Sequence, residues 1–110
     1  MPERRTSPRV PANLTVKCRW SSGVERGKTI NISAGGVLLI VPKKIPAGTR
    51  ITLEFEPGEP PLELRGLVRH AAEDLGHGIE FVEVLPSQRD ALLEFIARLE
   101  KGNSAASASA

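Results

Sequence analysis

The sequence predicts a mainly β protein, a six-stranded antiparallel β-barrel with a C-terminal α-helix. Two observations support this fold class. Short segments of alternating apolar and polar residues fill the chain from residue 14 to residue 84, and turn-forming residues separate them without an intervening helical pattern. The apolar spacing changes to a helical period only after Pro86. Closing the sheet into a barrel would remove its exposed edges.

The clearest strand pattern is the alternation of Ile51, Leu53 and Phe55 with polar residues. In the first predicted strand, Cys18 shares an apolar face with its neighbours at i−2 and i+2, so we expect it to be a core residue. Gly66 is expected to mark a β-bulge in the fifth strand. The six predicted strands cover residues 14–20, 24–32, 37–41, 50–56, 62–71 and 77–84.

One amphipathic helix is predicted after Pro86. Ser87 is a good N-cap residue, and Asp90 follows it at the spacing of a capping box. Lys101 and Gly102 are typical of a helix C-terminus. Three apolar residues at i, i+4 and i+7 form the face that would pack on the barrel: Leu92, Ile96 and Leu99.

The length of 110 residues suits one domain. We expect a flexible basic arm over residues 1–12, the barrel with its helix over residues 13–101, and a disordered Ser/Ala-rich tail over residues 102–110. No run of about 18 apolar residues is present to span a bilayer, and the N-terminus lacks the apolar stretch of a signal peptide. The single cysteine allows no internal disulfide. These features predict a cytoplasmic protein without membrane insertion.

The charge is distributed unevenly along the chain. The whole chain has a net charge of +2, but residues 1–28 contain seven lysines and arginines and two glutamates, a net charge of +5. An anionic partner would be attracted to this basic segment. The alternative is a solvated basic arm that binds nothing.

Two polar clusters stand out from the strand patterns. The first contains Arg4, Arg5 and Arg9, and the second is the polar turn over residues 31–36. Guanidinium groups bind a phosphate or a guanine edge through paired hydrogen bonds, and glycines in a turn let the backbone approach a ligand. Together the clusters suit a small, planar, polyanionic ligand. Taken alone, the second cluster is simply a good tight turn.

An enzyme or a metal site is not indicated. His70 and His77 lie on neighbouring predicted strands without a cysteine or carboxylate at metal-binding spacing, so surface or strand positions explain them. Cys18 has no positioned base beside it that would make it a nucleophile. The chain also has no phosphate-binding loop or dinucleotide-binding motif.

Binding to DNA or RNA is not expected either. Proteins that bind single-stranded nucleic acid use exposed aromatic side chains as stacking platforms. The chain has no tyrosine, and Trp20 lies on an apolar strand face. The three phenylalanines take predicted core-facing or helix positions: Phe55, Phe81 and Phe95.

The two clusters resemble the signature motifs of the PilZ domain, RxxxR and [D/N]xSxxG. The first motif matches Arg5 to Arg9 and the second matches Asn31 to Gly36. Residues 76–81 are similar to the Gly-x-Gly-x-x-Phe pattern of the family's last barrel strand. The resemblance covers roughly residues 3–100 and implies a six-stranded barrel that binds the bacterial second messenger cyclic di-GMP.

The resemblance also implies a role for each motif residue. Arg5 and Arg9 would bind a guanine Hoogsteen edge and the phosphates. Asn31 and Ser33 would hydrogen-bond the other guanine or its linkage. Asparagine accepts through one oxygen where the commoner aspartate offers two, which would reduce the affinity.

Four further residues complete the predicted site. Gly36, helped by Gly35, would keep the turn open beneath the ligand. Arg4 precedes RxxxR, where an arginine favours an intercalated ligand dimer in this family, so two ligands per domain are expected. Arg69 would stack its guanidinium on a base, with a plain surface position as the alternative. We expect the basic arm to become ordered across the barrel when ligand binds.

The resemblance implies a second-messenger sensor that binds cyclic di-GMP and relays it to an unidentified effector protein. The output would be the control of motility, exopolysaccharide or a related process. The alternative is a ligand-independent adaptor with the same fold that acts by protein–protein contacts. Neither function needs a cofactor or makes the protein an enzyme.

Overall fold

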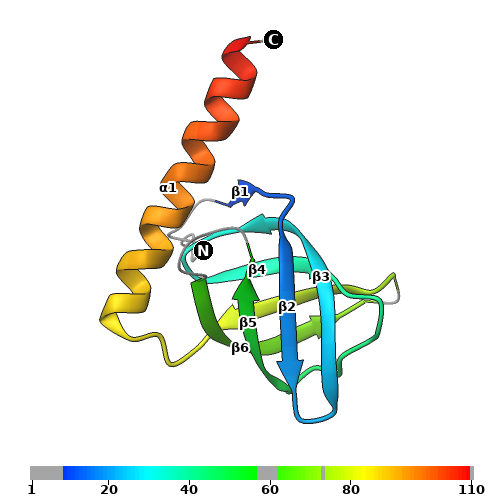
Figure 1. Ribbon diagram of the computed structural model, residues 1–110. Coiled ribbons are helices and arrows are strands. Elements are labelled where there is room, and N and C mark those ends of the chain that lie inside the picture. The colour runs from blue at the N-terminus through cyan, green and yellow to red at the C-terminus, as the bar shows by residue number, and fades with distance from the viewer. Residues whose placement is uncertain (1–8, 57–61, 73, 110) are drawn as a thin grey trace, which may run out of the picture.

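The computed structural model describes residues 9–56, 62–72 and 74–109, with side chains described up to Lys101. This part of the chain forms seven strands and one helix (Figure 1). In chain order they are β1 (Val10–Pro11), β2 (Thr15–Trp20), β3 (Gly23–Ile32), β4 (Gly36–Ile40), β5 (Arg50–Phe55), β6 (Leu62–Ala71), β7 (Gly76–Phe81) and α1 (Pro86–Ser109).

The strands form a closed antiparallel barrel. The sheet order is β1-β3-β2-β5-β6-β7-β4, and a further pairing between β3 and β4 joins the two ends of the six-stranded ring. Strand β1 lies outside this ring and pairs only with β3. The predicted fold class, a six-stranded antiparallel β-barrel with a C-terminal helix, is therefore confirmed.

The core fills the barrel with the inward-facing residues of every long strand. Phe55 is fully buried and its ring contacts the rings of Phe81 and Phe95, the latter from α1. Cys18 is fully buried as well, which confirms the prediction of a core residue. Burial, with a smaller contribution from the charge of Glu25, raises the pKa of the Cys18 thiol to about 12, so the thiol is not a reactive nucleophile.

Strand β1 lies within the segment that the sequence predicts to be a flexible arm. Val10 pairs with Ile32 and is buried against the core. The Thr29 hydroxyl donates to the Ala12 carbonyl oxygen at 2.9 Å and accepts from the Leu14 amide at 2.8 Å. Residues 10–12 are therefore held against the barrel, although β1 is not one of its six ring strands. A two-residue strand is too short to produce a period-two pattern, which is why the sequence did not predict it.

Two β-bulges interrupt the register of the ring. In β3 the register shifts between Thr29 and Asn31, and in β6 it shifts between Val68 and His70. The prediction of a bulge at Gly66 is therefore wrong. At Gly66 a Cβ would lie 2.5 Å from Cγ2 of Ile79, so this glycine instead allows the close packing of a neighbouring side chain.

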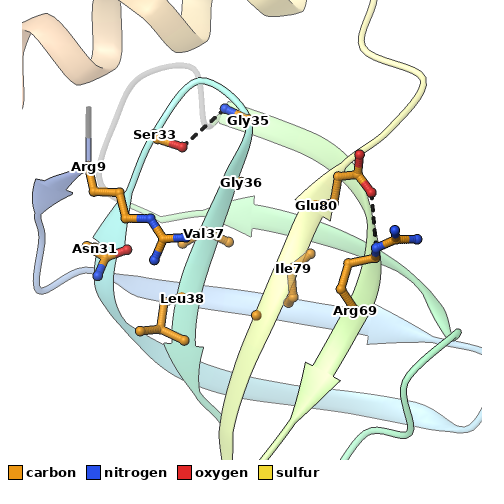
Figure 2. Close-up of a pocket in the computed structure, with 11 residues that line it drawn as sticks. Arg9, Asn31, Ser33, Gly35, Gly36, Val37, Leu38, Arg69, Ile79 and Glu80 are labelled. Carbon is orange, nitrogen blue, oxygen red and sulfur yellow. Dashed lines mark hydrogen bonds and ion pairs between the residues drawn. The ribbon is translucent and has the colours of Figure 1, made fainter. Parts of the chain in front are cut away.

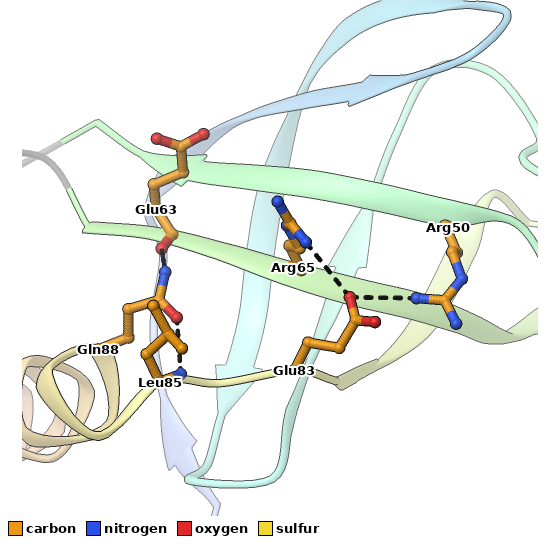
Figure 3. A network of polar contacts seen from close by, with 6 residues as sticks. All are labelled: Arg50, Glu63, Arg65, Glu83, Leu85 and Gln88. Atoms are coloured by element: carbon orange, nitrogen blue, oxygen red, sulfur yellow. Dashed lines mark hydrogen bonds and ion pairs between the residues drawn. The ribbon is translucent and has the colours of Figure 1, made fainter.

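Helix α1 begins at Pro86, which suits the first helical position because proline lacks an N–H that would otherwise need a partner. The preceding Leu85 amide donates to Oε1 of Gln88 at 2.8 Å, and Gln88 Nε2 donates to the Glu63 carbonyl oxygen of β6 (Figure 3). The predicted cap at Ser87 with Asp90 is therefore wrong by two residues. A glutamine at the third helical position supplies the capping contact instead.

The helix continues to Ser109, beyond the predicted end at Lys101 and Gly102. Three of the last eight helical residues are alanine, which has the highest helix propensity, and this offsets the cost of the glycine. Within the described residues, no helix is both long and apolar enough to cross a membrane. The predicted packing face is confirmed, since its three residues are buried or pack against the core: Leu92, Ile96 and Leu99.

His77 lies on β7 and is fully buried. Its Nε2 accepts a hydrogen bond from the Ile45 amide at 2.9 Å, and its Nδ1 lies 2.8 Å from the Leu75 carbonyl oxygen. These contacts require a neutral ring with its proton on Nδ1. Burial, aided by the charge of Lys44 and opposed by the Leu75 contact, lowers the pKa of His77 below its ordinary value of 6.5.

The buried His77 should make the stability depend on pH. The unfolded chain binds a proton at a higher pH than the folded protein does, so the free energy of unfolding should decrease as the pH falls below about 6.5. Urea denaturation at about pH 7.5 and pH 5.5 would measure the difference. His77→Gln should lose much of this dependence, whereas His70→Gln, at an exposed histidine, should keep it. An equal pH dependence in all three proteins would contradict the assignment.

Candidate ligand pocket

A pocket of about 330 Å³ lies on the outer surface of the barrel over strands β4 and β7 (Figure 2). It brings together six of the eight residues that the sequence predicts for the site, from three separate parts of the chain. Arg4 and Arg5 lie outside the described residues. The lining residues are Arg9, Asn31, Ser33, Gly35, Gly36, Val37, Leu38, Arg69, Gly78, Ile79 and Glu80.

The floor of the pocket is formed by the outward-facing positions of β4 and β7. Gly36 is paired with Glu80, and Leu38 with Gly78. Burial alternates along both strands, with Val37 and Ile79 directed into the core. Because two of these outward positions are glycines, the strands leave a shallow hollow where side chains would otherwise stand.

The sequence did not assign Leu38, Gly78 or Glu80 to the site. A signal for Gly78 was present in the sequence, since a glycine inside a strand often marks the close approach of a ligand or another backbone. Glu80 gave no such signal, because an exposed acidic residue on a strand is ordinary.

Asn31 reaches the pocket because of the bulge in β3. Gly27 and Thr29 are buried, so an unbroken alternation would direct Asn31 into the core and Ile32 outward. The register shift after Thr29 reverses this, leaving Ile32 fully buried and Asn31 on the pocket rim opposite Leu38. Bulges are a common means of re-aiming a side chain beside a functional site.

The bulge in β6 lies at Arg69, which stays on the outer surface, and it turns the next residue, His70, outward as well. Val68 pairs with Ile79 and His70 pairs with Gly78, so Arg69 is the extra residue of the bulge. Arg69 and His70 are both exposed, in contrast to the alternation earlier in the strand. Arg69 Nε lies 3.3 Å from Oε1 of Glu80, and this ion pair forms one side of the pocket (Figure 2).

Arg9 is placed by the strand that follows it. Val10 and Pro11 pair with Ile32 and Asn31 of β3, which holds the start of β1 beside the Asn31 rim. The Ala12 amide also donates to the Ile30 carbonyl oxygen at 3.0 Å. Figure 2 shows the Arg9 guanidinium next to Asn31, on the opposite side of the pocket from Arg69.

The turn between β3 and β4 is closed by its own hydrogen bonds. The Ser33 amide donates to the Gly36 carbonyl oxygen at 2.8 Å, and the Gly35 amide donates to Oγ of Ser33 at 3.2 Å. The Phe81 amide donates to the Gly35 carbonyl oxygen at 2.9 Å, which fixes the turn to β7. Ser33 is buried and holds the turn as well as lining the pocket.

The side chains that line the pocket suit an anionic ligand. Among the described lining residues, two arginines face one glutamate, so the site favours an anion. No group of metal-ligating side chains exists in the part of the chain that the structure describes. Paired guanidiniums, an amide and a flat glycine floor suit a planar ligand with phosphate groups.

A family model for the PilZ domain matches residues 3–98. The chain belongs to the PilZ domain family. The match spans both polar clusters, the whole barrel and most of the helix. Among curated protein sequences, none matches the chain significantly.

Solved PilZ structures share this fold at low sequence identity. The PilZ domain of YcgR from Escherichia coli, with cyclic di-GMP, is 15% identical and has a TM-score of 0.83 over 98% of this chain and 100% of that chain. The PilZ domain of CeSA from a cellulose-synthesizing bacterium is 20% identical, with a TM-score of 0.72 over 86% and 99% of the two chains. The Bacillus subtilis inhibitor of motility, MotI/DgrA, is 23% identical with a TM-score of 0.73; the match covers 92% of this chain and 53% of that protein.

The two glycines of the PilZ motif have different structural roles. A Cβ at Gly36 would overlap the Ile79 carbonyl oxygen of β7, whereas a Cβ at Gly35 would be 4.0 Å from its nearest neighbour, Oγ of Ser33. Gly36 is therefore needed for the close approach of β4 to β7. The sequence assigned it to keeping the turn open, and that role remains a prediction.

Alanine substitutions should separate these two glycines. Gly36→Ala should lower the free energy of unfolding by about 1–3 kcal/mol, because the backbone of β7 must move to accept the methyl group. Gly35→Ala should change it by no more than about 0.5 kcal/mol, since the position is exposed and open. Urea denaturation of both variants would measure the difference. Equal losses of stability would contradict the close-approach explanation.

Proposed function

We propose that the protein is a bacterial sensor that binds cyclic di-GMP in the pocket over β4 and β7 and relays this signal to a partner protein. The observation that carries the proposal is the convergence of six predicted site residues on one pocket, five of them from within the two PilZ motifs. Its volume of about 330 Å³ is at the lower end of the range for small-molecule sites. The YcgR structures that share the fold are described as having cyclic di-GMP.

Each side of the pocket fits a different part of this ligand. Arg9 presents a guanidinium that can form paired hydrogen bonds with a phosphate or with N7 and O6 of guanine. Asn31, beside Arg9, supplies an amide that both donates and accepts. Leu38 and the two floor glycines offer an apolar, flat surface on which a base can lie. Arg5, from the same motif as Arg9, is proposed to bind alongside it.

Relay to a partner is supported by the path from the pocket to the helix. Strand β7 lines the pocket at Glu80 and leads within a few residues to the start of α1. Between them, Oε1 of Glu83 lies 3.2 Å from Arg50 Nη1 and 3.5 Å from Arg65 Nη1, which ties the connection to β5 and β6 (Figure 3). We propose that ligand binding alters the surface around this connection, and that the partner controls motility, exopolysaccharide or a related process.

The experiment that tests the proposal is isothermal titration with cyclic di-GMP, with GTP as the control ligand. We expect saturable binding near two ligands per chain. Arg9→Ala should weaken binding by about tenfold to a hundredfold, because each lost charge-assisted hydrogen bond costs roughly 1.5–3 kcal/mol.

Arg26→Ala is a matched control for that titration. Arg26 also lies on the basic N-terminal part of the chain, but it is exposed, pairs with Glu56 at 2.9 Å and does not line the pocket. Its removal should leave the affinity unchanged. Failure of the folded wild-type protein to bind at high micromolar ligand would contradict the sensor and favour the ligand-independent adaptor.

Filling the floor of the pocket should abolish binding without unfolding the protein. A Cβ at Gly78 would lie 3.8 Å from the Cβ of His70, an ordinary contact, so the strand accepts a side chain there. Gly78→Leu should project into the pocket and reduce affinity by at least about tenfold, with a smaller loss for Gly78→Ala. Titration together with circular dichroism would separate blocked binding from unfolding. Wild-type affinity in Gly78→Leu would place the ligand elsewhere.

A further inference from the structure

Glu80 is the single acidic side chain among the described residues that line the pocket. A carboxylate beside a phosphate-binding site lowers the affinity for an anion unless it meets a hydrogen-bond donor of the ligand. Its side chain is 52% exposed, so a ligand can reach it, and Arg69 partly balances its charge. A base with donors on its edge would turn this carboxylate into a favourable contact.

We propose that Glu80 accepts hydrogen bonds from the Watson–Crick edge of a guanine base and so determines the base specificity of the pocket, with Arg69 as its positioning residue. This inference rests on the proposed function and names what that site selects. It assigns Arg9 to a phosphate or the Hoogsteen edge, and assigns Glu80 to the neighbouring Watson–Crick edge of a base.

The chemistry of the two purines explains the selection. Guanine presents N1–H and its 2-amino group side by side as donors, and an ionised carboxylate only accepts, through two oxygens. The two donors of guanine can therefore each bind one oxygen of the carboxylate. Adenine has an acceptor at N1 and no 2-amino group, so Glu80 would face a lone pair. A site built on such polar pairing rejects a ligand that lacks the partner group much more strongly than an apolar pocket does.

The geometry places Glu80 where such an edge would lie. Its strand partner is Gly36, and Gly78 lies two residues before it on the same outer face, so the carboxylate stands at the border of the flat floor. Arg9 and Asn31 lie across this floor from it (Figure 2). A nucleotide on the glycine floor can then have its phosphate toward Arg9 and the Watson–Crick edge of its base toward Glu80.

Arg69 fixes the carboxylate rather than contacting the base face. Its Nε lies 3.3 Å from Oε1 of Glu80, and as the extra residue of the β6 bulge it is directed onto the same surface. We therefore assign Arg69 to positioning, in place of the stacking role that the sequence suggested.

The test compares cyclic di-GMP with cyclic di-IMP, whose hypoxanthine bases lack only the 2-amino group. Both ligands keep the phosphates and the N7 and O6 acceptors, so the arginine contacts are the same for both. The wild-type protein should bind cyclic di-GMP about tenfold to a hundredfold more tightly than cyclic di-IMP. In Glu80→Gln this ratio should fall to near one, chiefly through weaker binding of cyclic di-GMP. Arg69→Ala should lower the ratio as well.

Glu83→Gln is the matched control. Glu83 also pairs with an arginine of β6, Arg65 at 3.5 Å, at similar exposure, but it lies outside the pocket. This variant should keep the wild-type ratio. Thermal melts should show that Glu80→Gln stays folded, because an exposed ion pair contributes little to stability.

Each other outcome has a definite meaning. An unchanged ratio in Glu80→Gln, no preference for cyclic di-GMP in the wild type, or an equal effect of Glu83→Gln would overturn the role of Glu80 while leaving cyclic di-GMP binding in place. No binding of cyclic di-GMP by the wild-type protein would overturn the proposed function and this inference together.

Discussion

The register shift after Thr29 in β3 is the constraint on which the pocket depends. It reverses the alternation of the strand, so Ile32 enters the core and Asn31 faces the surface. It also positions β1, because Val10 and Pro11 pair with these same two residues. The placement of Arg9 therefore follows from the same bulge. A strand without the bulge would bury a polar amide without a partner and expose an isoleucine, each at a cost in stability.

The pocket lies between two strands that each shift register. Strand β6 shifts at Arg69 as β3 does at Ile30, and between them β4 and β7 contribute a floor with glycines at two outward positions. The barrel supplies rigidity, since the β3–β4 pairing closes the ring and leaves the floor strands paired on both sides. Polar side chains thus stand around a flat surface that is held in place by the core beneath it.

The fold and much of the site could be predicted from the sequence, because they depend on local patterns and short motifs. The errors concern features that depend on contacts between strands. Strand-like apolar patterns separated by turn residues predicted all six barrel strands, and the resemblance to PilZ motifs selected residues that the structure brings together. The bulge was predicted at Gly66 instead of Arg69 because a bulge depends on pairing between strands, and the pattern of one strand does not contain that pairing.

Gly78 and Glu80 were not predicted as site residues, because they line the pocket only through their strand pairing with Leu38 and Gly36. The cap at Gln88 was missed because the residue before the helix is Leu85, whose apolar side chain is not an N-cap signal, so only the Leu85 amide marks the cap.

The central claim is that cyclic di-GMP binds on the outer surface of β4 and β7, between the two bulges. A ¹H–¹⁵N correlation spectrum recorded during titration with cyclic di-GMP tests it most directly, because every non-proline backbone amide reports on its own surroundings. We expect the largest shifts at Asn31, Leu38 and Gly78, with little change on the β2–β5 face around Arg19. Shifts confined to that other face, or none at saturating ligand, would contradict the account.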